Sequence, residues 1–344
     1  MRVYFNHETA PTKGGIARDS EYLVDLFTQD PFEQITHEFT NSNFLNSLHR
    51  KIHAVKGLIL KGEKMPAGAY DLFFDFQFSS YVATDEQMWH FIRVHDIFPI
   101  SNPEWFHFWS SWLFKRSIRR SINHDRTIYI CNSETTRSNL IRYFPKLSSK
   151  SHVIYCMPRI PEASESKECK CSGCAYLSAS DFQSFTLMVG TIEPRKNYQK
   201  IVALDRTGRL NNNVVIVGRS GWKSRGVKRQ LKATMRIRWI DDCCDKALLK
   251  IYLKADAFLS TSHDEGFNLP AGEACILGKT LILPRLPIYD ELYGDSYLQY
   301  TEIDELVSIL NSLSGIPNLS PIAQINYQKM NVRARDAILS GISM

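Results

Sequence analysis

The chain has 344 residues, of which 44% are apolar and 23% are charged, with a formal net charge of +6. This length predicts two domains, and without a run of 18 uncharged apolar residues or a signal-peptide core we expect a soluble intracellular protein. The eight irregularly spaced cysteines fit reduced thiols better than a disulfide framework. The moderate positive charge suits an anionic partner such as a nucleotide diphosphate or a lipid surface, and no nucleic-acid-binding motif accompanies it.

The first half of the chain alternates apolar strands with helical segments. Strands are predicted at residues 2–5, 71–76, 90–96, 127–133 and 152–157. Continuous apolar strands separated by helices are typical of a parallel sheet that is covered on both faces. We therefore predict a first α/β domain over residues 1–157, with a doubly wound, Rossmann-like sheet.

A polar stretch at residues 158–181 is predicted to be a linker or insertion, because it combines two prolines with several serines and has no amphipathic period. It contains a C-x-C-x-x-C cluster of Cys169, Cys171 and Cys174. A soft metal could bind there if Cys156 or another residue supplied a fourth ligand. The spacing is not a usual structural-zinc pattern, and a flexible insertion with free thiols is the alternative, so no metal is assigned.

The second half repeats the strand and helix alternation. Strands are predicted at residues 185–190, 213–218, 236–240, 257–260 and 280–284, with helices at 197–208, 227–235, 246–256 and 270–277. This pattern predicts a second doubly wound domain over residues 182–325. Residues 326–344 are expected to form a C-terminal helix that could return to the first domain.

Two glutamates, Glu265 and Glu273, lie eight positions apart in the stretch "STSHDEGFNLPAGEACILGKTLILP". Glu265 is on a loop after a predicted buried strand, at the carboxyl end where open α/β sheets place ligands. Glu273 is expected in the first turn of the following helix. Each could accept hydrogen bonds from vicinal hydroxyls, those of a ribose in the case of Glu273. The plain structural alternatives are a solvated loop acid and a carboxylate that complements the helix dipole.

The predicted helix that contains Glu273 also suggests an anion site. Pro270 suits its first position and Gly278 the position just past its end. Its N-terminus has free backbone N–H groups that favour an anion such as diphosphate, and Gly266 and Phe267 lie where that anion would arrive.

A second basic constellation occurs in "MVGTIEPRKNYQK", where the strand 185–190 ends in a turn followed by Arg195 and Lys196. Both cations could donate charge-assisted hydrogen bonds to phosphate oxygens. An exposed basic pair of no functional meaning is the alternative.

These residues carry a resemblance to a known family. "VGTIEPRKN", "GFNLPAGEACILGK" and the glutamate pair resemble the retaining glycosyltransferases of family 4, and specifically their mannosyltransferase-like branch. "VHDIFPISNP" and "YICNSETTRSNLIRYF" resemble the N-terminal segments of that branch in the same order, whereas the first 90 residues match poorly. The resemblance implies a GT-B fold, in which two Rossmann-like domains face a central cleft.

The resemblance also implies site roles. Glu273 would bind the donor ribose, Glu265 would contact the donor sugar, and Lys196 with Arg195 would hold the diphosphate. His95 would act at the reaction centre and the glycine turn Gly14–Gly15 would approach the phosphates. A buried, satisfied histidine is the alternative for His95. Asn268 is also expected at the donor site, where many relatives carry glycine.

The implied reaction is transfer of a sugar from a nucleotide-sugar to a hydroxyl of a glycan or lipid-linked glycan, with retention of configuration. Mannose from GDP-mannose is favoured, and rhamnosyl or another hexosyl transfer is the alternative. The chain has no Asp-x-Asp motif, so no divalent metal or other cofactor is expected. Rivals are a donor-hydrolysing or epimerising enzyme and a catalytically silent nucleotide-sugar-binding subunit. A role in cytoplasmic synthesis of lipopolysaccharide or capsule is expected.

The segment "WFHFWSSWLFKRSIRR", residues 105–120, joins aromatic residues to four cations. On one helix, Trp105, Phe108, Trp109 and Trp112 would form a stripe. The stripe could pack on the N-terminal sheet, or it could lie on the cytoplasmic face of an anionic membrane and bring the enzyme to a lipid-linked acceptor.

Overall fold

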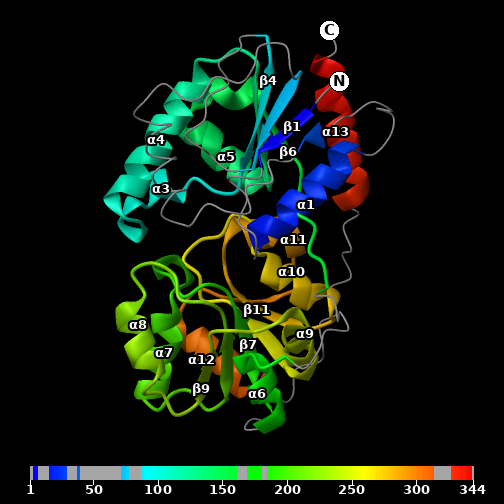
Figure 1. Cartoon of the computed structure of the whole chain (residues 1–344). Helices are drawn as coiled ribbons and strands as arrows, with labels where there is room; N and C mark the ends of the chain where they lie inside the picture. Colours follow the sequence, from blue (N-terminus) through cyan, green and yellow to red (C-terminus); the bar gives the residue numbers. More distant parts are fainter. Residues whose placement is uncertain are drawn as a thin grey trace. The chain divides into compact units, whose positions relative to one another are not determined.

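The computed structural model describes residues 3–6, 15–28, 37–38, 71–76, 87–160, 169–179, 184–313 and 327–342. The chain forms two compact units, one from residues 1–157 with 326–344 and one from residues 158–325. Each unit is built on a parallel sheet with helices around it (Figure 1). The predicted α/β class with two Rossmann-like sheets is therefore confirmed.

Within the described residues, the first unit contains a six-stranded sheet in the order β2-β1-β3-β4-β5-β6. All of its neighbouring strands pair in parallel. The strands are β1 (Val3–Asn6), β2 (His37–Glu38), β3 (Leu72–Asp75), β4 (Trp89–Val94), β5 (Thr127–Cys131) and β6 (Ser151–Val153). The helical elements are α1 (Gly15–Thr28), α3 (Phe98–Ser101), η1 (Pro103–Trp105), α4 (Phe108–Ile122), α5 (Glu134–Tyr143), η2 (Pro145–Lys150) and α13 (Tyr327–Ile342).

Helices cover both faces of the first sheet because alternate strand residues point to opposite sides. Phe74 and Phe91 on one face pack with residues of α1 and α13, whereas Ile92 and Tyr129 on the other pack with residues of α4 and α5. The C-terminal helix α13 belongs to this unit, since its Asn331 side chain donates to the backbone oxygen of Tyr155 at 2.9 Å.

The second unit contains, in its described part, a six-stranded parallel sheet in the order β12-β11-β10-β7-β8-β9. The strands are β7 (Thr186–Val189), β8 (Val214–Val217), β9 (Ile237–Ile240), β10 (Ala257–Leu259), β11 (Thr280–Pro284) and β12 (Leu298–Tyr300). The helical elements are α6 (Ser172–Ala179), η3 (Pro194–Lys196), α7 (Tyr198–Arg206), α8 (Arg225–Leu231), α9 (Asp245–Lys254), α10 (Leu269–Ile276), α11 (Pro287–Tyr293) and α12 (Ile303–Asn311).

Strand β10 shows how both faces of this second sheet are covered. Ala257 and Leu259 pack in a core with α7, α8 and α12, whereas the Phe258 ring between them stacks on Tyr252 of α9, with centroids 6.4 Å apart. Strand β12 was missing from the predicted elements, because its three residues are too few to show a period.

The stretch 158–181 is more ordered than a linker, because it contains helix α6. The sequence offered no period for this helix since its apolar residues do not gather on one side. Instead, the helix packs against α9 and β9.

Helix α4 differs from the predicted stripe. Trp105 is not on the helix but in η1, and its ring packs on Phe98 with centroids 5.7 Å apart. Helix α4 buries Ser111, Ser117, Ile118 and Ser121. Its Phe108, Trp109 and Trp112 side chains are exposed, Phe108 by 73%.

Candidate active site

The two predicted constellations of the second unit come together at one edge of the sheet. Strands β7 and β10 are hydrogen-bonded neighbours, so the loops after them leave the same edge. The Thr261 hydroxyl donates to the backbone oxygen of Lys196 at 2.8 Å, and the His263 N–H donates to that of Arg195 at 2.9 Å. The loop after β10 is thus fastened to the turn after β7.

That turn depends on close backbone packing. A Cβ atom on Gly218, which follows β8, would meet the Gly190 carbonyl oxygen at 1.9 Å. The same carbonyl accepts a hydrogen bond from the Tyr198 hydroxyl at 2.7 Å. The glycine after each strand therefore lets the turn pack closely, and the turn leads directly into η3, which carries the two cations.

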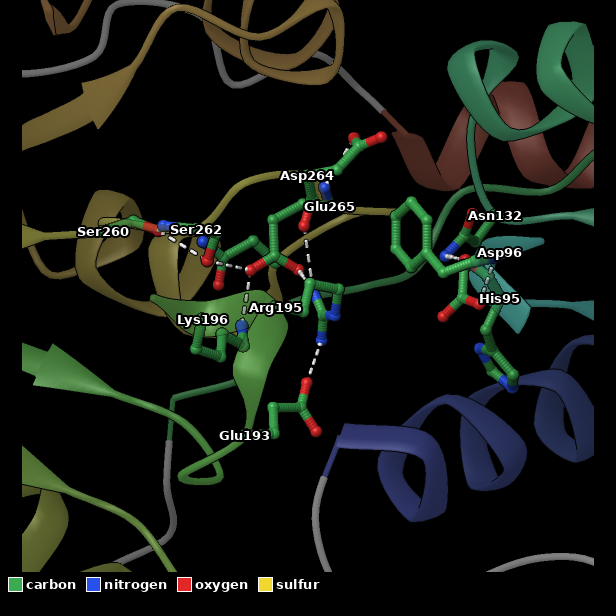
Figure 2. A network of polar contacts seen from close by, with 12 residues as sticks. His95, Asp96, Asn132, Glu193, Arg195, Lys196, Ser260, Ser262, Asp264 and Glu265 are labelled. Atoms are coloured by element: carbon green, nitrogen blue, oxygen red, sulfur yellow. Dashed lines mark hydrogen bonds and ion pairs between the residues drawn. The ribbon is translucent and has the colours of Figure 1, made fainter. Parts of the chain in front are cut away.

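At the centre of the site, Glu265 accepts from both cations (Figure 2). The Lys196 Nζ atom lies 2.5 Å from Oε1 of Glu265, and Arg195 donates to Oε2. Arg195 also donates to Glu193 at 2.7 Å, and the Ser262 hydroxyl donates to Oε1 of Glu265 at 2.7 Å. We name these five residues the charged cluster.

The charged cluster is largely shielded from water. The Glu265 side chain is 4% exposed, and those of Lys196 and Arg195 are 12% and 15% exposed. Burial raises the pKa of Glu265, but Arg195 and Lys196 lower it more, so its pKa falls to about 2. Burial lowers the pKa of Lys196 and Glu265 counteracts this. Glu265 is therefore an anionic acceptor at neutral pH, and neither the solvated acid nor the exposed basic pair describes these residues.

Glu273 lies on α10 but not in its first turn, because the helix begins at Leu269, one residue before the expected Pro270. The predicted first-turn position was wrong, and with it the interpretation of Glu273 as a helix-dipole carboxylate. The side chain is buried, and its Oε2 accepts from the Tyr252 hydroxyl at 2.9 Å. Tyr252 thus fixes the carboxylate from α9.

The start of α10 holds the other predicted donor residues. Gly266 and Phe267 are buried in the loop before the helix. Asn268 has a φ of 67°, a left-handed conformation that asparagine tolerates better than most residues and that glycine adopts freely. Its Nδ2 donates to the Tyr289 hydroxyl at 2.7 Å, while Oδ1 is buried without a hydrogen-bond partner among the described residues. A ligand hydroxyl would satisfy that oxygen.

In the first unit, His95 follows β4 and lies beside a buried ion pair. Its Nε2 is 3.0 Å from the Phe76 carbonyl oxygen and its Nδ1 is 3.7 Å from Oδ2 of Asp19. Burial lowers the pKa of His95, although Asp19 counteracts it. Asp19 is on α1, whose first residue is Gly15, so this helix and His95 are neighbours. Gly14 lies outside the described residues.

Arg93 and Asp19 were not among the predicted site residues. The Nε and Nη2 atoms of Arg93 donate to the two carboxylate oxygens of Asp19, at 2.7 and 2.8 Å. Its Nη1 atom donates to the Ile154 carbonyl oxygen at 2.7 Å. Burial raises the pKa of Asp19, but Arg93 and His95 lower it below its usual value. The 74-residue separation of the pair leaves no local signal. By contrast, Glu193 lies within "MVGTIEPRKNYQK", next to the predicted cations, so the sequence offered a signal for this site residue.

The comparisons with known proteins agree with this geometry. Residues 178–306 match the family described as "Glycosyl transferases group 1". The second unit thus contains a segment of this glycosyltransferase type. The match covers the charged cluster and both glutamates, and the predicted resemblance is confirmed.

Among curated relatives, the chain is 26% identical over 223 residues to the serotype-specific mannosyltransferase WbdA of Escherichia coli, covering 58% of the chain and 26% of WbdA. It is 27% identical over 220 residues to O-antigen chain mannosyltransferase B of Escherichia coli, covering 59% of the chain and 55% of that relative. The chain thus spans about a quarter of the first relative and about half of the second.

Among solved structures, the Anabaena protein HepE in complex with UDP and glucose aligns with a TM-score of 0.64 at 16% identity, over 100% of this chain and 99% of HepE. WaaG, described as a glycosyltransferase involved in lipopolysaccharide biosynthesis, aligns with a TM-score of 0.60 at 12% identity, over 99% of both chains. These similarities establish the GT-B fold.

Proposed function

We propose that this chain transfers a sugar from a nucleotide-sugar donor to a hydroxyl group of a glycan or lipid-linked glycan acceptor. The observation that carries the proposal is the charged cluster, where Lys196 and Arg195 hold a buried Glu265 at neighbouring strand ends. Mannose is the favoured sugar and GDP-mannose the favoured donor, since the curated relatives at 26–27% identity are mannosyltransferases that are named for a serotype or for the O-antigen.

The donor diphosphate would bind at the charged cluster. The Lys196 ammonium has three donor hydrogens and Glu265 accepts one, so others can reach phosphate oxygens. These largely shielded cations are in place before the reaction and would stabilise the charge that develops on the departing diphosphate without a divalent metal. Glu265, held as an anion, would accept from donor sugar hydroxyls, and Glu273 from the ribose.

In the proposed reaction, the bond between the anomeric carbon and the phosphate oxygen breaks while the acceptor oxygen attacks from the same face. Because attack and departure occur on the same face, the anomeric configuration is retained, and the acceptor proton passes to the departing phosphate oxygen. The role of His95 at the reaction centre rests on the family resemblance; within its own unit the ring is held by Phe76 and Asp19.

Helix α4 supports contact with an anionic membrane surface, where the enzyme would meet a lipid-linked acceptor on the cytoplasmic side. Trp109 is 69% exposed beside Phe108, and its ring lies 6.3 Å from that of Trp112. Towards the C-terminal end of α4 lies a surface groove of about 370 Å³, lined by Trp112, Asn123 and the cations Lys115, Arg116, Arg119 and Arg120. Aromatic rings at the headgroup boundary and cations on anionic lipid form a typical interfacial surface. No helix among the described residues is long and apolar enough to span a membrane.

Vesicle sedimentation tests the surface of α4. We expect binding to vesicles with phosphatidylglycerol that weakens as salt rises, and loss of binding when all four groove cations become glutamine. The matched control replaces four cations on and beside α8 with glutamine: Arg225, Lys228, Arg229 and Lys232. Equal binding of the wild type to neutral and anionic vesicles would contradict the electrostatic contact.

Release of nucleoside diphosphate tests the proposed reaction. We expect GDP-mannose to be consumed rapidly only with an acceptor glycan, and an α-linked product in its NMR spectrum, since retention preserves the donor configuration. Equal turnover without acceptor would indicate a hydrolase or epimerase instead. Donor binding with no turnover on any acceptor would favour the silent subunit. Turnover of a rhamnose donor but not of GDP-mannose would show that the transferred sugar is rhamnose.

A further inference from the structure

Four cysteine thiols from two distant segments meet in the second unit. Cys169, Cys171 and Cys174 lie at the start of α6, and Cys244 precedes α9. Their four sulfur atoms all lie within 4.8 Å of one another, and the Sγ atoms of Cys174 and Cys244 are 3.8 Å apart. The fourth thiol missing from the C-x-C-x-x-C cluster is thus supplied from 70 residues downstream.

The sulfur spacing fits one tetrahedral ion. With zinc–sulfur bonds of ~2.3 Å, the sulfurs of a tetrahedral site are ~3.8 Å apart. A disulfide would bring two of them to ~2.05 Å. An iron–sulfur cluster places several atoms between its thiolates and would separate them further.

Backbone groups around the sulfurs are arranged to stabilise thiolates. The N–H groups of Cys174 and Cys244 both donate to the Cys171 sulfur at 3.4 Å, and the Ala247 N–H donates to the Cys244 sulfur at 3.4 Å. Cys244 is the N-cap of α9, where the helix dipole favours a negative charge. Hydrogen bonds to the ligand atoms are typical of metal sites and fix the ligands in place.

The two segments are also fitted to each other through their backbones. The Gly173 N–H donates to the Asp242 carbonyl oxygen at 3.0 Å, and a Cβ atom on Gly173 would meet the Cys243 sulfur at 2.5 Å. The sulfur of Cys156, the fourth ligand considered from the sequence, instead lies in the first unit, 3.4 Å from Arg93.

We propose that Cys169, Cys171, Cys174 and Cys244 bind one Zn²⁺ ion in a closed structural site. Four thiolate ligands complete a tetrahedral shell, so no position is open for water or substrate. The ion fastens α6 to the turn between β9 and α9, at the β9 edge of the sheet. This role is independent of the proposed sugar transfer, which uses the charged cluster and needs no metal.

Metal analysis of the full chain, purified under reducing conditions and freed of any tag, tests the site. We expect about one zinc per chain in the wild type and less than a tenth of that in Cys171→Ser and Cys244→Ser. Cys243→Ser is the matched control, because Cys243 is adjacent to Cys244 but outside the four-thiol group. Cys275→Ser, a half-buried free thiol on α10, is the second control, and both should keep their zinc.

Cobalt substitution keeps the test decisive if a serine variant fails to fold. The zinc-free wild type should take up one Co²⁺, show the visible and thiolate charge-transfer absorption of a tetrahedral sulfur site, and lose it when Zn²⁺ is added. The proposal is overturned if the folded wild type purifies without zinc and takes up neither ion. It is also overturned if Cys243→Ser loses zinc as completely as Cys244→Ser, or if thiol counting finds the four cysteines in disulfides.

Discussion

Two groups of buried charges among the described residues, one in each unit, differ in whether they have hydrogen-bond donors available for a ligand. In the first unit, Arg93 is on strand β4, its side chain is 0% exposed, and Asp19 and two carbonyl oxygens accept from it. In the second unit, Arg195 and Lys196 are on a turn beyond a strand, are partly exposed, and converge on Glu265. Buried charge alone therefore does not mark a binding site. In our proposal the diphosphate binds at Lys196, which is on a turn and has ammonium hydrogens beyond the one that Glu265 accepts.

Removing a charge from the first unit should have the largest effect on stability. Arg93→Met leaves Asp19 buried without its cation, and we expect a loss of roughly 3–5 kcal/mol in the free energy of unfolding, measured with urea. The double variant Arg93→Met with Asp19→Asn should recover part of it, because no charge is left unpaired. A loss below about 1 kcal/mol in the single variant would show that this pair does not support the fold.

Acidification should weaken the charged cluster. The pKa of Glu265 is lowered from 4.5 to about 2, so its carboxylate adds stability above pH 4.5 that is lost as pH falls towards 2. The stability difference between wild type and Glu265→Gln should therefore be on the order of 3 kcal/mol at neutral pH and shrink below pH 4.5. Urea unfolding at a series of pH values measures it; a difference that does not change with pH would contradict the ion pairs.

Lys196→Ala should affect donor binding more than the fold. Loss of a hydrogen bond to a charged phosphate is expected to cost roughly 1.5–3 kcal/mol, which is more than tenfold in donor affinity. Calorimetry measures the affinity, with Lys254→Ala, an exposed lysine at the end of α9, as the control. Unchanged donor affinity in Lys196→Ala would show that Lys196 does not bind the diphosphate.

Variants of the two glutamates should differ, one weakening nucleotide binding and the other reducing sugar transfer. Glu273→Gln should raise the dissociation constant of the nucleoside diphosphate by about tenfold, since one ribose hydrogen bond weakens. Glu265→Gln should leave that constant nearer to the wild-type value and mainly reduce turnover of the whole donor. If both variants lost the free nucleotide equally, this division between the two carboxylates would be wrong.

The sequence predicted what local patterns encode and missed what long-range packing decides. The apolar runs predicted the described strands of both sheets except the short β2 and β12, and two strand ends with charged loops predicted Glu265 and Lys196 as site residues. Their mutual ion pairs, like the pair of Arg93 with Asp19, join residues about 70 positions apart, which no period reveals. The thiol of Cys244 was missed for the same reason. The stripe on α4 was ambiguous because an apolar face looks the same in a core and on a surface.

Titration of the wild-type chain with GDP, GDP-mannose and other nucleotide-sugars, followed by thermal unfolding, tests the central claim most directly. A ligand at 100 times its dissociation constant stabilises the folded state by ~2.7 kcal/mol. We expect one nucleotide-sugar to raise the unfolding temperature of wild type, and a much smaller rise in Lys196→Ala at the same concentration. No stabilisation of the folded wild type by any nucleoside diphosphate or nucleotide-sugar would contradict the claim that the charged cluster is a donor site.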